Sequence, residues 1–187
     1  MELEPKKFYK FLSPRPTVLL TTIDRENNVN AAPFSFVMPI SIDPPLLAVS
    51  IGMKHNTLSD IHATREFVIN VPSESMLDRF WACSQEHPPG TDVLKLAGLT
   101  QVPSSKVLAP SVGECNICLE CFLEFEKQMG DHVLLVGNVV NLAVKGEIIG
   151  PDGKIDIKKA ASLMHISGQK FAVAEREILP RPLDNQK

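Results

Sequence analysis

The chain has 187 residues, of which 44% are hydrophobic and 22% are charged, and its formal net charge is −3. This length fits one domain, 1–187, and the composition is that of a folded globular protein rather than a disordered chain. The negative charge, without a run of Lys or Arg, argues against nucleic acid as a partner, because nucleic-acid binding depends on a basic face.

The N-terminal residues 1–5 are acidic and do not resemble a signal peptide. No segment approaches the roughly 20 apolar residues that a membrane-spanning helix needs. We therefore expect a cytoplasmic protein with no membrane partner. A C-terminal tail from about residue 176 carries apolar residues and two prolines, so it should lie along a partner subunit rather than form a regular helix.

The first half of the chain predicts strands in neighbouring pairs. β-branched residues at 17–23 predict a strand, the polar cluster 24–28 a turn, and 29–32 a returning strand. Another strand is expected at 46–51. A capping box at 57–60, with Asp60 in the place of the usual Glu, predicts a helix. After a strand at 67–71, Ser73 is expected to cap a second helix.

The second half begins with a loop, 85–111, that contains a short helical piece at 93–97. Alternating polar and apolar residues from 115 to 126, the turn Gly130-Asp131 and the apolar run 132–140 then predict a hairpin. Regular strand–helix alternation is missing, which disfavours a parallel sheet. We therefore predict a mainly β fold with a few helices, built as an antiparallel, Greek-key-like barrel.

The segment 50–57 predicts a phosphate site. The glycines form neither a Rossmann nor a P-loop signature, but here a strand ends, Gly52 permits a bend and a helix begins at Asn56 or Thr57. The first turn of a helix has unpaired N–H groups that attract anions, and Lys54 and the Thr57 hydroxyl add a charge and a donor. Taken alone, these residues favour the alternative, an ordinary capped surface helix in which Asn56 and Thr57 only satisfy the backbone.

The segment 30–39 contains two prolines and cannot be a regular inner strand, because proline removes a donor from the ladder. A rigid loop flanked by aromatic residues would suit the edge and face of a planar ring. The alternative is a bulged strand or barrel corner, with Phe34 or Phe36 in the core.

Three of the four cysteines, Cys115, Cys118 and Cys121, have the spacing of metal ligands. Cys118 and Cys121, however, are an odd number of residues apart on a predicted strand, so they lie on opposite faces. We therefore expect no metal site, and thiols that act as small apolar fillers, with one or two exposed.

Six segments together resemble the flavin reductase-like family, whose members are FMN-binding split-barrel proteins. They are 15–18, 30–35, 43–46, 56–58, 66–70 and 130–137, in the family's order and spacing. The resemblance covers about residues 8–175 and is most specific to the flavoredoxin branch. It implies a homodimer that holds FMN near the subunit interface.

The resemblance also implies the site residues. The isoalloxazine ring or ribityl chain would contact Asn30, Pro33, Phe34, Ser35 and Phe36, and the phosphate would lie among Ser50, Lys54, Asn56 and Thr57. His132 would lie near the flavin or the nicotinamide pocket, as the one candidate catalytic residue, and His165 would approach from the C-terminal segment. Relatives often have Lys directly after the Asp at position 92, where this chain has Val93. Lys95 is the candidate substitute.

FMN would supply the redox chemistry, and the protein its binding and orientation. An NAD(P)H-dependent flavin oxidoreductase is one reading of the sequence. The alternative is a non-enzymatic flavoredoxin-type carrier that holds FMN tightly and exchanges electrons with partner proteins. A third is a split barrel that binds another ligand or none.

Overall fold

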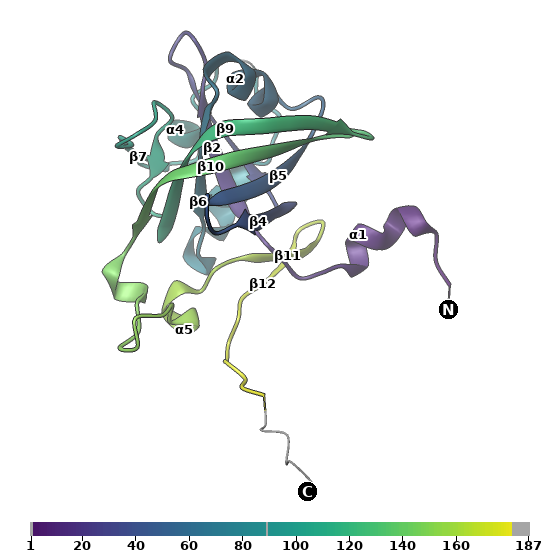
Figure 1. Cartoon of the computed structure of the whole chain (residues 1–187), viewed down its shortest axis with the longest axis vertical. Coiled ribbons are helices and arrows are strands. Elements are labelled where there is room, and N and C mark those ends of the chain that lie inside the picture. Colours follow the sequence, from purple (N-terminus) through teal and green to yellow (C-terminus); the bar gives the residue numbers. More distant parts are fainter. Residues whose placement is uncertain (1, 89, 181–187) are drawn as a thin grey trace, which may run out of the picture.

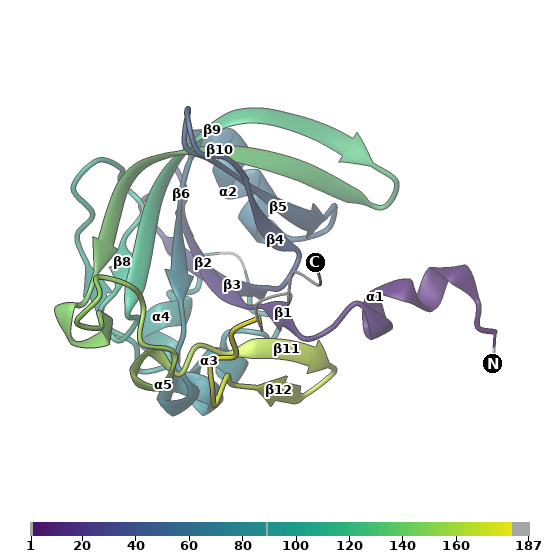
Figure 2. The same cartoon turned by 60° about the horizontal axis from the view of Figure 1, so that its bottom comes forward.

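The computed structural model describes residues 2–88 and 90–180, and its body is a seven-stranded antiparallel sheet (Figure 1). The strand order is β3-β2-β6-β9-β10-β5-β4. The strands span Val18–Ile23 (β2), Val29–Phe34 (β3), Val37–Ser41 (β4), Leu46–Gly52 (β5), Glu66–Val71 (β6), Ile117–Met129 (β9) and His132–Val144 (β10). Figure 2 shows how the sheet curls into the split barrel that the sequence predicts.

Both faces of the central strands are buried, which explains why β2 begins with an unbroken apolar run. Val18 and Leu20 of β2 pack in one hydrophobic cluster, together with Leu58 of helix α2 (Asn56–Thr64). Leu19 belongs to a second cluster, which includes Phe80. Because successive side chains of a strand point to opposite faces, the two clusters lie on the two sides of the sheet.

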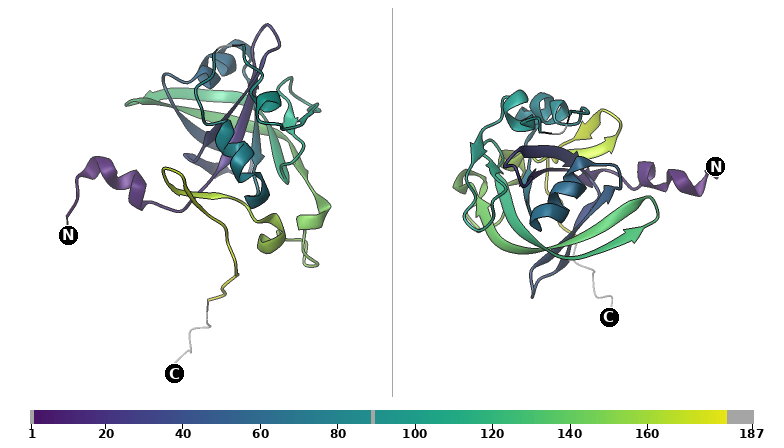
Figure 3. Two further views of the ribbon diagram at one scale, coloured as in Figure 1. Left: turned by 180° about the vertical axis from the view of Figure 1, so that it is seen from behind. Right: turned by 90° about the horizontal axis from the view of Figure 1, so that it is seen from above.

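Helices cover both sides of the curled sheet. Helix α2 lies inside the curve, as the view from above in Figure 3 shows. The second cluster takes in residues of η2 (Glu74–Met76), α3 (Leu77–Ala82) and α4 (Val93–Leu96). The helices expected from 57, 73 and 93 onwards are therefore present.

Neither predicted cap makes a side-chain hydrogen bond to the backbone of its helix, and only Ser73 stands at the predicted N-cap position. Helix α2 has His55 at its N-cap without a side-chain cap, and Thr57 is already the second helical residue. Its hydroxyl accepts a hydrogen bond from Asn30 of β3 instead. Ser73 does stand at the N-cap of η2, but its hydroxyl bonds that of Ser75. In both places a neighbouring side chain takes the group that would have capped the helix.

The segment 30–39 is not the predicted rigid loop. Pro33 lies in β3 and Pro39 in β4, and only Ser35 and Phe36 separate the two strands. These strands are the two edges of the seven-stranded sheet, where a missing N–H breaks no ladder. The expectation that this stretch is no inner strand is therefore confirmed.

The predicted hairpin is confirmed as β9 and β10, which turn at Gly130 with a φ of 67°. Smaller elements complete the fold: β1 (Arg15–Pro16), β7 (Gln101–Val102), β8 (Ser111–Val112), β11 (Met164–Ser167), β12 (Lys170–Ala172), α5 (Ile157–Ala160) and η3 (Gly146–Ile148). Residues 173–180 form neither helix nor strand, and the rest of the predicted tail lies outside the described residues.

An N-terminal arm, residues 4–12, projects from the barrel (Figures 1 and 2). It consists of η1 (Pro5–Lys7) and α1 (Phe8–Phe11) and contains no buried residue. Arg15 ties the base of the arm to the body, because its guanidinium donates to the carbonyls of Tyr9 and Leu12 and lies beside His165.

The cysteines lie as the strand geometry predicts. Cys118 belongs to the cluster on one side of the sheet and Cys121 to the cluster on the other. The expected exposure of one or two thiols is wrong, since all four are free and buried. Within residues 2–88 and 90–180, no three His, Cys, Asp or Glu side chains are grouped to hold a metal ion. No helix in that part of the chain is long and apolar enough to cross a membrane.

Candidate functional site

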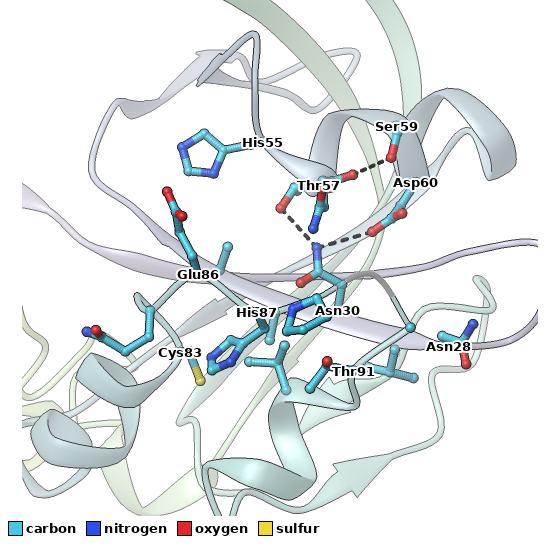
Figure 4. Close-up of a pocket in the computed structure, with 18 of the residues that line it drawn as sticks. Asn28, Asn30, His55, Thr57, Ser59, Asp60, Cys83, Glu86, His87 and Thr91 are labelled. Atoms are coloured by element: carbon cyan, nitrogen blue, oxygen red, sulfur yellow. Dashed lines mark hydrogen bonds between the residues drawn. The ribbon is translucent and has the colours of Figure 1, made fainter.

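A pocket of about 620 Å³ lies between β3, the first turns of α2 and loop residues from 83–88 and 90–93 (Figure 4). This volume is typical of sites for drug-sized ligands and cofactors, which span roughly 300–1,000 Å³. The lining residues that the sequence predicts are Asn30, Pro33, Lys54, Asn56 and Thr57. Strand β3 thus meets the strand–Gly–helix segment at one site.

The polar wall of the pocket is a hydrogen-bonded chain of side chains. Asn30 Nδ2 donates to Thr57 Oγ1 at 3.2 Å and to Asp60 Oδ2 at 3.1 Å. Thr22 Oγ1 of β2 donates to the same Asp60 oxygen at 2.8 Å. Asp60 was expected only as part of a cap. Its contacts instead join α2 to β2 and β3. These contacts depend on how the helix packs against the sheet, which the local sequence does not predict.

The titratable groups of this wall respond to burial. Burial raises the pKa of Asp60, and the hydrogen bonds from Thr22 and Asn30 oppose that rise. Partial burial lowers the pKa of His55, and the neighbouring His132 lowers it further. In both residues, burial disfavours the charged form of the side chain.

One corner of the pocket suits an anion. Strand β5 ends at Gly52, and Lys54 and His55 follow immediately before α2 begins at Asn56. The first backbone N–H groups of a helix have no intrahelical partner, and the helix dipole places partial positive charge there. The predicted phosphate corner is therefore part of the pocket.

The far wall of the pocket was not predicted. It contains Cys83, Glu86, His87 and Thr91, which Figure 4 shows facing β3 and α2 across the open space. The sequence gives this stretch no periodicity, so nothing in it announced a contact with β3. Lys95 does not line the pocket, and its backbone N–H is bound by the Asp92 cap of α4.

A second, smaller pocket of about 210 Å³ contains Phe34, Ser35 and His165. The His165 Nδ1 atom lies 3.2 Å from Ser35 Oγ and 3.1 Å from the Arg15 guanidinium. Its other walls include Trp81 and Phe171, and Pro33 lines both pockets. The structure therefore divides the predicted site residues between two adjoining spaces.

The remaining three predicted residues, Phe36, Ser50 and His132, line neither pocket. The ring of Phe36 stacks on His132 at 5.7 Å, and the Ser50 amide donates to the Phe36 carbonyl at 2.8 Å. A Cβ at Gly52 would meet both His55 and His132, so His132 lies close to the phosphate corner. A contact between these three residues and a cofactor stays a prediction.

The family model of the flavin reductase like domain matches residues 11–170. The chain belongs to this family. Component B of nitrilotriacetate monooxygenase from Bacillus cereus is 27% identical, and the match covers 96% of this chain and 95% of that one with a TM-score of 0.86.

Two further proteins are similar to this chain. Flavoredoxin of Desulfovibrio vulgaris (Miyazaki F) has the same fold, with 24% identity, 93% of both chains covered and a TM-score of 0.81. The NADH-dependent FMN reductase AsuE2 of Streptomyces nodosus subsp. asukaensis is 28% identical over 73% of this chain and 73% of its own length.

Proposed function

We propose that this protein binds FMN in the 620 Å³ pocket and passes electrons through it, from NAD(P)H or a protein donor to an acceptor. Membership of the flavin reductase-like family makes the chain a flavin-linked redox protein. The observation that carries the proposal is the meeting of the α2 N-terminus, Lys54 and Asn30 in one pocket. In this proposal the chain is one domain, with an N-terminal arm at residues 4–12 and a C-terminal tail from about residue 176.

The donor set of the pocket fits FMN. The first turn of α2, with Lys54 beside it, offers N–H groups and positive charge to a phosphate. Asn30 and the β3 backbone lie beyond this corner, where polar groups of a ribityl chain or ring edge need partners. Lys54 and the loop residues 83–88 line the same pocket of about 620 Å³, a volume within the range of cofactor sites.

FMN supplies the redox chemistry when it is bound. The chain's own residues hold it: Lys54, Asn56 and Thr57 at the phosphate end, and Asn30 along β3. The loop residues Glu86 and His87 form part of the far wall, across the pocket from β3 and α2. His132, beside His55, remains the candidate for contact with the second reactant.

A homodimer accounts for the exposed apolar surface of the single chain. Phe8, Phe11 and Leu12 of the N-terminal arm are 64%, 66% and 68% exposed, and Ile42 beside β4 is 95% exposed. Large exposed apolar patches on a soluble chain mark interaction sites. Sedimentation of the holoprotein at micromolar concentration tests this part of the proposal: we expect a dimer, and a monomer that holds FMN tightly contradicts it.

We also place the protein in the cytoplasm, where four free thiols are expected. Its electron donor is tested by mixing the FMN-loaded protein with NADH or NADPH without oxygen. Rapid bleaching of the oxidised flavin band identifies an NAD(P)H-dependent oxidoreductase. Bleaching by neither nucleotide, in a protein that keeps its FMN, favours the carrier alternative.

A further inference from the structure

Asp60 is a half-buried carboxylate on α2 that contacts two strands of the sheet. Its carboxylate turns from α2 toward the sheet, where Thr22 and Asn30 both donate to its Oδ2 atom. Thr22 is itself fully buried. The Oδ2 atom of Asp60 is therefore an acceptor from both neighbours.

This contact fixes the orientation of the Asn30 amide. The oxygen and nitrogen of an amide exchange places by a flip of the side chain, and the hydrogen-bond partners decide between the two. The Oδ2 atom of Asp60 accepts, so the Asn30 atom that faces it is the nitrogen. Its two N–H groups are both used, one on Asp60 and one on Thr57. The Asn30 oxygen is left as an acceptor toward the pocket, as Figure 4 shows.

The same chain defines the Thr57 hydroxyl as a donor. Its oxygen accepts from Asn30, which leaves the hydroxyl proton for another partner. The Thr57 side chain lies at the pocket wall beside the start of α2, and the residue is 1% exposed. The pocket therefore presents a donor next to its anion corner and an acceptor further along β3.

We propose that Asp60 is a positioning residue that sets this donor–acceptor order and thereby aligns the flavin. The inference rests on the proposed function, and it adds a residue and a ligand chemistry to it. The ordered wall matches a molecule with an anionic group at one end and hydroxyl or N–H donors behind it. A phosphate would accept from Thr57, and a ribityl hydroxyl or ring N–H would donate to Asn30.

Electrostatics alone predicts the opposite effect of Asp60. A carboxylate near a phosphate repels it, so removal of the charge should tighten FMN binding. Positioning predicts that removal of the carboxylate weakens FMN binding. The Asn30 amide is then free to flip, and its N–H₂ group would face a hydroxyl or N–H donor of the ligand. The sign of the change in affinity separates the two explanations.

The test is a double-mutant cycle on FMN binding, in which flavin fluorescence is followed as the apoprotein is titrated. Asp60→Ala is expected to raise the Kd for FMN about tenfold, the loss of one aligned hydrogen bond. In the Asn30→Ala background the same change is expected to alter the Kd less than about twofold, because the amide that Asp60 positions is gone. Equal effects in the two backgrounds, or tighter binding by Asp60→Ala, would overturn the inference.

Asp60→Asn is the rescue variant. It keeps one accepting oxygen for Thr22 and Asn30 and removes the charge, so its Kd should be equal to or lower than that of the unchanged protein. A tenfold rise in the Kd of Asp60→Asn would overturn the positioning role. This outcome can be read even if Asp60→Ala does not fold. An unchanged protein that binds no FMN contradicts the proposed function itself, which is a separate outcome.

The matched control is Asp78→Ala, which removes an exposed carboxylate on α3, outside the pocket. Its Kd should stay within about twofold of the unchanged protein, because a surface charge at a distance is largely screened. Far-UV circular dichroism and thermal unfolding of each apoprotein check that the fold is retained.

Discussion

Gly137 of β10 lies directly against the ring of Phe67 of β6, so that a Cβ at position 137 would overlap the Phe67 Cζ atom. Phe67 is completely buried and cannot move without disturbing the core. Gly137→Ala is therefore expected to lower the free energy of unfolding by about 1–3 kcal/mol, the cost of overpacking. Urea denaturation measures it. Gly146→Ala is the control, because a Cβ there meets nothing within 4 Å, and equal midpoints for the two variants would contradict the close approach.

Glu120 of β9 is 3% exposed and accepts hydrogen bonds from the Ser105 and Lys106 amides and from Asn141. Burial acts to raise its pKa, but these bonds outweigh burial and hold the pKa below its ordinary value of 4.5. A lowered pKa in the folded state stabilises the protein above pH 4.5, and this contribution is lost as the pH falls through the lowered pKa.

Glu120→Gln is therefore expected to cost about 1–3 kcal/mol of unfolding free energy at neutral pH, because an N–H₂ group then replaces an oxygen that accepts hydrogen bonds from Ser105, Lys106 and Asn141. The difference from the unchanged protein should shrink below pH 4.5. Urea denaturation over a pH series measures both. Glu124→Gln, on the same strand but exposed, should have little effect. A constant difference at every pH would argue against the lowered pKa.

The phosphate corner is tested by measuring the affinities of each variant for FMN and for riboflavin, which lacks the phosphate. Substitutions in this corner should change the affinity for FMN and leave that for riboflavin nearly unchanged. Thr57→Ala is expected to weaken FMN binding by about 1–3 kcal/mol, the range of a charge-assisted hydrogen bond. Lys54→Ala should weaken it in the same direction, and less at high salt, because an exposed charge is screened. Lys127→Ala removes an exposed charge on β9, outside both pockets, and is the control. Unchanged FMN affinity in both site variants would move the phosphate elsewhere, with Lys95 the next residue to test.

The four thiols should be unreactive in the folded protein. Burial raises the pKa of Cys83 to about 11 and that of Cys121 to about 12, and it also raises those of Cys115 and Cys118. The thiolate is the reactive form, so a thiol reagent at neutral pH should modify the native chain slowly and all four cysteines after unfolding. Rapid modification of Cys115, Cys118 or Cys121 in the native state would contradict their burial in the two hydrophobic clusters.

The local motifs explain which parts of the site the sequence predicts. Lys54, Asn56 and Thr57 are neighbours in the chain, and the end of a strand, a glycine and the start of a helix suffice to place them together. The cysteine faces follow from the period of two along a single strand. The edge positions of Pro33 and Pro39 follow from their missing donors.

The parts that the sequence could not predict depend on tertiary register. Asp60 has the pattern of a capping residue, and only the packing of α2 against β2 and β3 turns it toward Asn30. The loop at 83–88 reaches the pocket without any periodicity of its own. Phe36 and His132 are almost a hundred residues apart, and their stacking depends on the pairing of β5 with both β4 and β10.

The visible absorption spectrum of the protein, purified without added flavin and then denatured, tests the central claim most directly. The account predicts a yellow protein that releases about one FMN per chain, identified by chromatography against FMN, FAD and riboflavin. Colourless protein that also fails to bind added FMN would contradict it.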